Sequence, residues 1–263
     1  MTSKVQKLQR ASLRDPVLIE VNTKYKTVDT LEQNFLFRPA LHKETYLVYL
    51  LTQMQGKKTI IFTSTCNASL KLVLMLKFLN FKATNIHGKM SQQMRLASLN
   101  KFKTGEKTIL IATDVASRGL DIPSVDLVIN FDIPGNSKDY VHRVGRTARA
   151  GRSGRAITMV TQYDVEIYKK IEELIGKTLE EYPVENKHAL VLSDSVIEAM
   201  RQATIEMRDS KYLKEDEGDG EKDDAEADLD KDMFKKRTYK NSGKLSHSKG
   251  FSGSFARKRQ RTH

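Results

Sequence analysis

The stretch KKTIIFTSTCNASLKLVLMLKFLNF, residues 57 to 81, changes its hydrophobic period halfway along its length. Residues 57 to 65 contain a short apolar run rich in β-branched side chains, which predicts a buried strand. From Cys66 onward the apolar residues recur at helical spacing. Near-continuous apolar strands that alternate with helices are typical of a parallel sheet covered on both faces, so this unit indicates an α/β fold.

The same alternation continues on both sides of this unit. Helices are predicted at 41–54, 91–105, 137–150 and 164–176, and further strands at 82–88, 108–114, 126–132 and 155–161. We therefore expect an open, doubly wound sheet, in which ligands gather at the carboxyl ends of the strands. Polar residues follow three of these strands, at 63–65, at His87 and Gly88, and at Thr113 and Asp114.

The overall charge indicates an anionic partner. Lys and Arg total 45 against 33 Asp and Glu, a formal charge of +12, which suits nucleic acid first and an acidic membrane surface second. The single Cys66 excludes an internal disulfide and favours a reducing compartment. The six histidines show no zinc-ligand spacing, and no apolar run reaches the roughly 20 residues of a membrane span, so neither a metal site nor membrane insertion is expected.

Both ends of the chain differ from its middle. Residues 1–14 carry four basic side chains and no acid, as either a mitochondrial presequence or a surface helix would. Residues 190–213 predict an amphipathic helix that packs either on the core or on a partner, with Val196, Met200, Ala203 and Met207 on one stripe. Residues 215–232 have a net charge of −9 and residues 235–263 one of +10. Such charge blocks predict a disordered tail.

Two motifs can carry chemistry. In ATDVASRGLDI, residues 112–122, Asp121 can accept hydrogen bonds from ribose hydroxyls, although a purely structural turn has the same pattern. HRVGRTARAGRSGR, residues 142–155, has an arginine at every third position. Either a polynucleotide meets the whole series, or one pair such as Arg146 and Arg149 grips a small anion such as a γ-phosphate, or the helix is simply solvated.

These motifs together resemble those of the DEAD-box RNA helicases. HRVGRTARAG is similar to their sixth motif, ATDVASRGLD to their fifth, TIIFTST to their fourth, and IHGKMSQQMR to the segment with their QxxR element. Residues 1–180 share the resemblance, and VQKLQRA, NFDIP and VTQYDVE are most similar to the nucleolar subfamily that processes pre-ribosomal RNA. The sixth motif departs from the common pattern at Ala148, where glycine is frequent.

The resemblance implies a second RecA-like domain that closes with a first one around ATP and single-stranded RNA. It implies that Arg146 and Arg149 are arginine fingers, that His142 couples the two domains, and that Asp121 and Gly119 belong to the ATP site. The RNA path is expected along Thr113, Gln92, Arg95 and Gly88. Ribosomal RNA processing implies a nuclear, nucleolar location with pre-ribosomal proteins as possible partners.

The sequence contains no GxxxxGK[ST] phosphate loop and no DEAD sequence. We therefore expect a remnant of the first domain and linker at 1–27, the helicase C-terminal domain at 28–180, a helical extension at 181–214 and the tail at 215–263. Magnesium would be held by the first domain, and the chain alone is expected to hydrolyse ATP negligibly. The alternative is a non-catalytic RNA-binding or partner-docking module.

Overall fold

The computed structural model describes the backbone of residues 27–28, 30–117, 120–149 and 151–216, and the side chains of these residues as far as 209. The predictions for the N-terminal stretch and for the charged tail therefore lie outside the described residues. A seven-stranded sheet occupies the centre, and every pairing in it is parallel. The strands are β1 (Leu31–Phe37), β2 (Thr59–Thr63), β3 (Ala83–Ile86), β4 (Ile109–Thr113), β5 (Leu127–Asn130), β6 (Gly154–Val160) and β7 (Glu180–Glu181).

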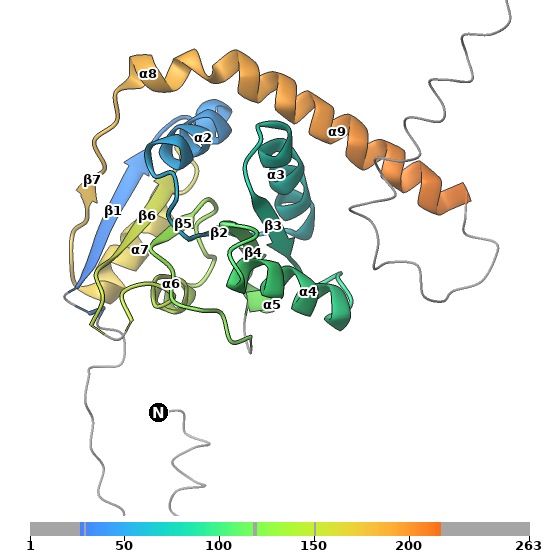
Figure 1. Ribbon diagram of the computed structural model, residues 1–263. Coiled ribbons are helices and arrows are strands. Elements are labelled where there is room, and N and C mark those ends of the chain that lie inside the picture. Colours follow the sequence, from blue (N-terminus) through green and yellow to red (C-terminus); the bar gives the residue numbers. More distant parts are fainter. Residues whose placement is uncertain (1–26, 29, 118–119, 150, 217–263) are drawn as a thin grey trace, which may run out of the picture. The chain divides into compact units, whose positions relative to one another are not determined.

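The strand order β3-β4-β2-β5-β6-β1-β7 is that of a doubly wound sheet, with helices on both faces (Figure 1). One face carries α2 (Lys43–Gln53) and α3 (Cys66–Phe78). The other carries α4 (Gln92–Lys103), α5 (Asp114–Ser117), α6 (Ser137–Val144) and α7 (Val165–Ile175). A short 3-10 helix, η1 (Ala40–His42), leads into α2.

Successive side chains of β2 point to opposite faces of the sheet, so the strand contributes to the core on both faces. Ile60 and Phe62 join the cluster beneath α4 to α7, whereas Ile61 joins the cluster beneath α2 and α3. All five residues of β2 are buried because the strand is central and helices cover both of its faces. The chain then leaves the strand for α3, where the Thr65 hydroxyl caps the helix by accepting from the Ala68 amide at 3.0 Å.

All five strands predicted from the sequence are present, and two more are added. β1 pairs along its whole length with β6, and β7 pairs with the outer side of β1. The sequence did not predict β1 because its interior holds the polar residues Gln33 and Asn34, both buried. The Tyr140 hydroxyl donates to Gln33 Oε1 at 2.9 Å. This tertiary contact supplies a hydrogen-bond partner for a buried polar side chain inside the strand.

The helix predicted at 137–150 was too long, because α6 ends at Val144. Thr147 forms a parallel bridge with Val125, and its hydroxyl donates to the Val125 carbonyl at 2.5 Å. Ala148 then has a φ of 53°, in the left-handed region. Arg146 and Arg149 consequently lie on an irregular segment, residues 145–149, which we call the finger loop.

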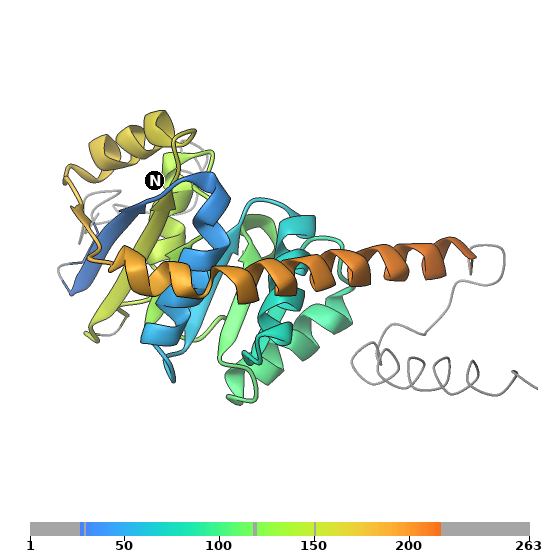
Figure 2. The same ribbon diagram turned by 90° about the horizontal axis from the view of Figure 1, so that it is seen from above.

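The C-terminal helices pack on the core. α8 (Asn186–Val191) and α9 (Ser193–Asp216) divide the helix predicted at 190–213, and α9 crosses α2 and α3 on their outer side (Figure 2). Val196 and Ala203 are buried there, and Met200 and Met207 are partly buried. The predicted stripe thus covers this chain's own core. Within the described residues, no helix is both long and apolar enough to cross a bilayer.

Candidate functional site

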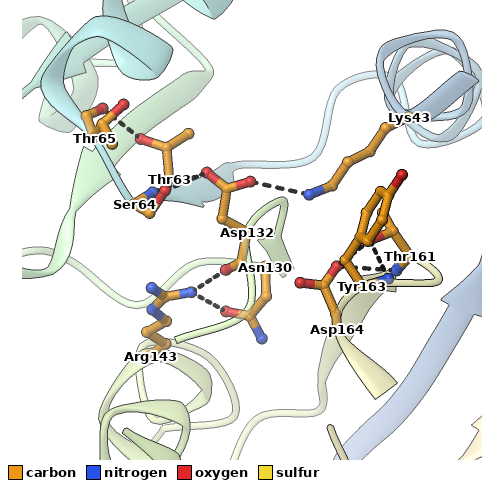
Figure 3. Close-up of polar contacts among 10 residues, drawn as sticks. All are labelled: Lys43, Thr63, Ser64, Thr65, Asn130, Asp132, Arg143, Thr161, Tyr163 and Asp164. Atoms are coloured by element: carbon orange, nitrogen blue, oxygen red, sulfur yellow. Dashed lines mark hydrogen bonds and ion pairs between the residues drawn. The ribbon is translucent and has the colours of Figure 1, made fainter. Parts of the chain in front are cut away.

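Arg143 is the most buried of the five regularly spaced arginines, with 2% of its side chain exposed. Its Nε and Nη2 atoms donate to the two carboxylate oxygens of Asp114 at 2.6 and 2.7 Å. Its Nη1 donates to the Asp132 carbonyl at 2.5 Å and approaches Asn130 Oδ1 at 3.4 Å (Figure 3). All these partners lie at the carboxyl ends of β4 and β5, so Arg143 fastens α6 to the sheet.

The Asp132 carboxylate makes further contacts in this region, with residues other than Arg143 (Figure 3). It accepts from Lys43 Nζ at 2.9 Å and from the Ser64 amide and hydroxyl at 2.9 and 3.0 Å. Burial alone would raise the pKa of Asp132, but Lys43 and Ser64 together hold that pKa below its usual value. Asp132, in the loop that leads into α6, is therefore held through both its carbonyl and its side chain.

Arg146 differs from Arg143 in having no such partner. Its side chain is half-buried and lines a small pocket between α5 and α6, together with Phe62, Asp114, Ser117, Asp139, His142 and Arg143. Among the described residues, none accepts a hydrogen bond from its guanidinium. Burial and the neighbouring Arg149 lower the pKa of Arg146 from its ordinary value. Arg146 is thus a partly desolvated cation with no bonded acceptor among the described residues, the condition in which an anionic ligand gains most.

Arg149 and Asp121 lie beside this cation. Arg149 is exposed, and its Nε donates back to the Gly145 carbonyl at 2.6 Å. Arg149 lies close enough to lower the pKa of both Arg146 and Asp121, although Lys103 has the larger effect on Asp121. The Asp121 side chain is 92% exposed. The predicted nucleotide residues therefore form one surface, with His142 exposed at its margin.

The backbone contacts of the finger loop show where it lies on the sheet. The Val125 amide donates to the Arg146 carbonyl at 3.1 Å, and the next residue, Asp126, donates to the Lys58 carbonyl at 3.0 Å. Lys58 and Asp126 immediately precede β2 and β5. The backbone of the finger loop thus sits near the amino ends of these strands, whereas the Arg146 side chain lines the pocket beside Asp114, which follows β4. The chain beyond α6 must return to the amino edge to start β6, and the loop lies on that return path.

The residues predicted to meet RNA do lie at the carboxyl edge. Thr113 ends β4, Gly88 follows β3, and Gln92 opens α4 with its side chain exposed. Arg95 Nη2 donates to the Ala116 carbonyl at 2.9 Å and its Nη1 approaches Gln92 Oε1 at 3.3 Å. The contact with Ala116 joins α4 to α5, the helix that begins at Asp114. Gly119, predicted for the nucleotide site, lies outside the described residues.

The site also contains residues that the sequence did not single out. Arg143 carried no predicted role of its own, and its partner Asp114 was noted only as a polar residue after a strand. Lys103 bonds to Asp121, and Lys43 bonds to Asp132. A carboxylate directly after a buried strand was the only signal available for Asp114. Arg155, the last arginine of the series, donates to Glu32 at 2.6 Å.

Comparisons with known proteins show what this chain is similar to. Residues 42–151 match the model of the helicase conserved C-terminal domain. The chain is 57% identical over 209 residues to the ATP-dependent RNA helicase DDX47 of Drosophila melanogaster, which covers 80% of this chain and 41% of that protein. It is 54% identical over 209 residues to the ATP-dependent rRNA helicase rrp3 of Schizosaccharomyces pombe, covering 80% of this chain and 45% of that protein.

This chain is also similar to a protein of known structure. The DEAD-box protein SrmB of E. coli, in complex with regulator of ribonuclease activity A, superposes with a TM-score of 0.56 at 34% identity. The match covers 59% of this chain and 91% of that one. The chain spans about half the length of the curated relatives it matches.

Proposed function

Because this chain belongs to the DEAD-box RNA helicases, whose C-terminal RecA-like domain it contains, we propose that it supplies one half of an ATP-dependent RNA-unwinding enzyme. The observation that carries this proposal is the half-buried Arg146, which has no hydrogen-bond acceptor among the described residues and lies near Arg149, itself near the exposed Asp121. Two guanidinium groups beside an exposed carboxylate suit a nucleoside triphosphate, with cations for phosphate and an acceptor for ribose.

The roles of these residues follow from their chemistry. Asp121 accepts the ribose hydroxyls, and Arg146 and Arg149 meet the charge that develops on the γ-phosphoryl group during transfer. Arg149 must release the Gly145 carbonyl to reach the phosphate, whereas Arg146 is already held in the pocket beside His142. His142 is exposed at the rim, where it can contact a second domain that closes on this surface.

Arginine fingers lower a barrier only for a phosphate that other groups hold in place. The sequence has neither a GxxxxGK[ST] loop nor a DEAD sequence, the elements that would bind the β- and γ-phosphates and magnesium. ATP would therefore be bound mainly by a first RecA-like domain, to which the magnesium is also assigned. On this account the chain alone turns over ATP negligibly.

RNA is assigned to the carboxyl edge, along Gly88, Gln92, Arg95 and Thr113. Arg95 ties this edge to α5, and Asp114 of α5 ties it to Arg143. A shift of the RNA-binding edge would thus be transmitted to α6, which leads into the finger loop. Contact with sugar and phosphate groups would make binding largely independent of sequence and sensitive to salt.

The substrate class is proposed to be ribosomal RNA, from the similarity to proteins named as rRNA helicases. This assignment carries with it a nuclear, nucleolar location and pre-ribosomal proteins as partners. The basic segment 235–263 would add salt-sensitive RNA affinity. The divisions at residues 27, 180 and 214 are retained as the proposed domain limits.

The test is RNA-stimulated ATP hydrolysis by this chain mixed with a first RecA-like domain. Arg146→Ala and Arg149→Ala are each expected to lower the rate by about 10³-fold, as loss of an arginine finger does. Arg152→Ala is the matched control, because Arg152 belongs to the same arginine series and is exposed. Equal losses in all three variants would show that general basicity, and not the finger pair, drives turnover.

A further inference from the structure

Asp121 depends on a single neighbour for its orientation. Its carboxylate oxygen Oδ2 lies 2.9 Å from Lys103 Nζ. Within the part of the chain that the structure describes, no other side chain donates a hydrogen bond to it. The segment from Leu120 to Pro123 has no regular structure, so little else restrains the side chain.

Lys103, in contrast, comes from a well-anchored position. It is the last residue of α4, and the preceding Phe102 is fully buried in the core. The Lys103 carbonyl accepts from Lys58 Nζ at 3.3 Å, and Lys58 is itself held through its amide by Asp126. The ammonium group is therefore presented from a fixed helix end, and its side chain is 37% exposed.

We propose that Lys103 is a positioning residue for nucleotide binding, which holds Oδ2 of Asp121 and leaves Oδ1 free to accept the vicinal hydroxyls of the ATP ribose. This inference rests on the proposed function of Asp121. A carboxylate already held in one rotamer loses less conformational entropy when ribose binds. The Lys103 hydrogen bond also lowers the pKa of Asp121, which keeps the carboxylate an acceptor.

The experiment compares ATP with 2′,3′-dideoxy-ATP, which lacks both hydroxyls, in a two-domain protein in which a first RecA-like domain precedes this chain. Lys103→Met is expected to raise the KM for ATP about three- to tenfold, as loss of part of a charged hydrogen bond does. The KM for 2′,3′-dideoxy-ATP and the kcat for both nucleotides should stay unchanged. Lys107→Met is the matched control, because it removes a lysine from the same edge and no described carboxylate pairs with Lys107.

The Asp121→Ala variant distinguishes a failure of this inference from a failure of the ribose-binding role proposed for Asp121. If Asp121→Ala does not raise the KM for ATP more than that for 2′,3′-dideoxy-ATP, the ribose role of Asp121 is wrong and the inference falls with it. If Asp121→Ala raises only the KM for ATP but Lys103→Met changes both KM values equally or neither, only the positioning role of Lys103 is overturned. Adding Lys103→Met to Asp121→Ala should have no further effect on either KM.

Discussion

Arg143 and Asp114 face each other across the joint between α6 and β4 and share two parallel hydrogen bonds, of 2.6 and 2.7 Å. The guanidinium group also lies 5.1 Å from the centre of the Phe62 ring. Three residues further on, Arg146 lines the same pocket without a described partner. Although the arginines are regularly spaced, Arg143 therefore has a structural role, whereas Arg146 has no hydrogen-bond acceptor among the described residues.

This difference between Arg143 and Arg146 predicts unequal effects of their substitution on stability. Arg143→Met should lower the free energy of unfolding by about 3 kcal/mol, because it leaves the Asp114 carboxylate uncompensated beside the core. Arg146→Met should change it by less than about 1 kcal/mol, because no described bond is lost. Denaturant unfolding of this chain measures both. A larger loss of unfolding free energy with Arg146→Met than with Arg143→Met would contradict the structural role assigned to Arg143.

Gly154, near the end of the arginine-rich stretch 142–155, makes room for the finger loop. A Cβ atom at Gly154 would lie 2.1 Å from Thr147 Oγ1 and 2.5 Å from the Ala148 amide nitrogen. Gly154→Ala should therefore break the bridge between Thr147 and Val125 and lower the free energy of unfolding by about 1–3 kcal/mol. In Gly135→Ala, the control, a Cβ meets nothing within 4 Å. Thermal unfolding of both variants tests this, and equal melting temperatures would contradict it.

Ala148 adopts a backbone conformation that glycine tolerates best, with a φ of 53°. Ala148→Val should destabilise the fold by about 2 kcal/mol, because a β-branched residue is strained in the left-handed region. Ala148→Gly should change stability by less than about 1 kcal/mol, because relief of strain offsets the loss of a buried methyl group and the added chain entropy. Denaturant midpoints of the two variants are the measurement, and a tolerated valine would show that the loop relaxes.

His87 should make stability depend on pH. Burial, with a smaller effect from Lys89, lowers the pKa of His87 from 6.5, and its Nδ1 is buried without a partner. The unfolded chain therefore binds a proton before the folded chain does as the pH falls. The stabilisation is complete above pH 6.5 and is lost as the pH falls below that value.

The measurement is the free energy of unfolding at pH 8 and at pH 5.5 for the wild type and for His87→Gln. The wild type should lose more stability than the variant over this range. The comparison at pH 8 serves as the control, because His87 is neutral in both states there. An identical pH dependence in the two proteins would show that His87 does not contribute.

The sequence predicted those parts of the fold in which local pattern and tertiary role coincide. The apolar run of β2 is buried on both faces, so its composition alone indicates a central strand. β1 was missed because Gln33 finds its partner in Tyr140, which lies 107 residues further along the chain. Its polar interior becomes acceptable only after the sheet has formed.

The sequence likewise predicted only part of the candidate site. Motif resemblance selected Arg146, Arg149 and Asp121, and the structure brings these three together. Helical periodicity extended α6 through the finger loop because it cannot detect the bridge from Thr147 to Val125, which depends on a neighbouring strand. The roles of Arg143 and Lys103 likewise depend on carboxylates 29 and 18 residues away.

The central claim is that this chain carries the phosphate-sensing arginines of a site whose phosphate-binding groups lie on another domain. The most direct measurement is ATP turnover by the purified chain with single-stranded RNA, before and after a first RecA-like domain is added. The account predicts no turnover above background by the chain alone, and RNA-stimulated turnover in the mixture that Arg146→Ala abolishes. RNA-stimulated turnover by the chain alone, abolished by the same substitution, would contradict it.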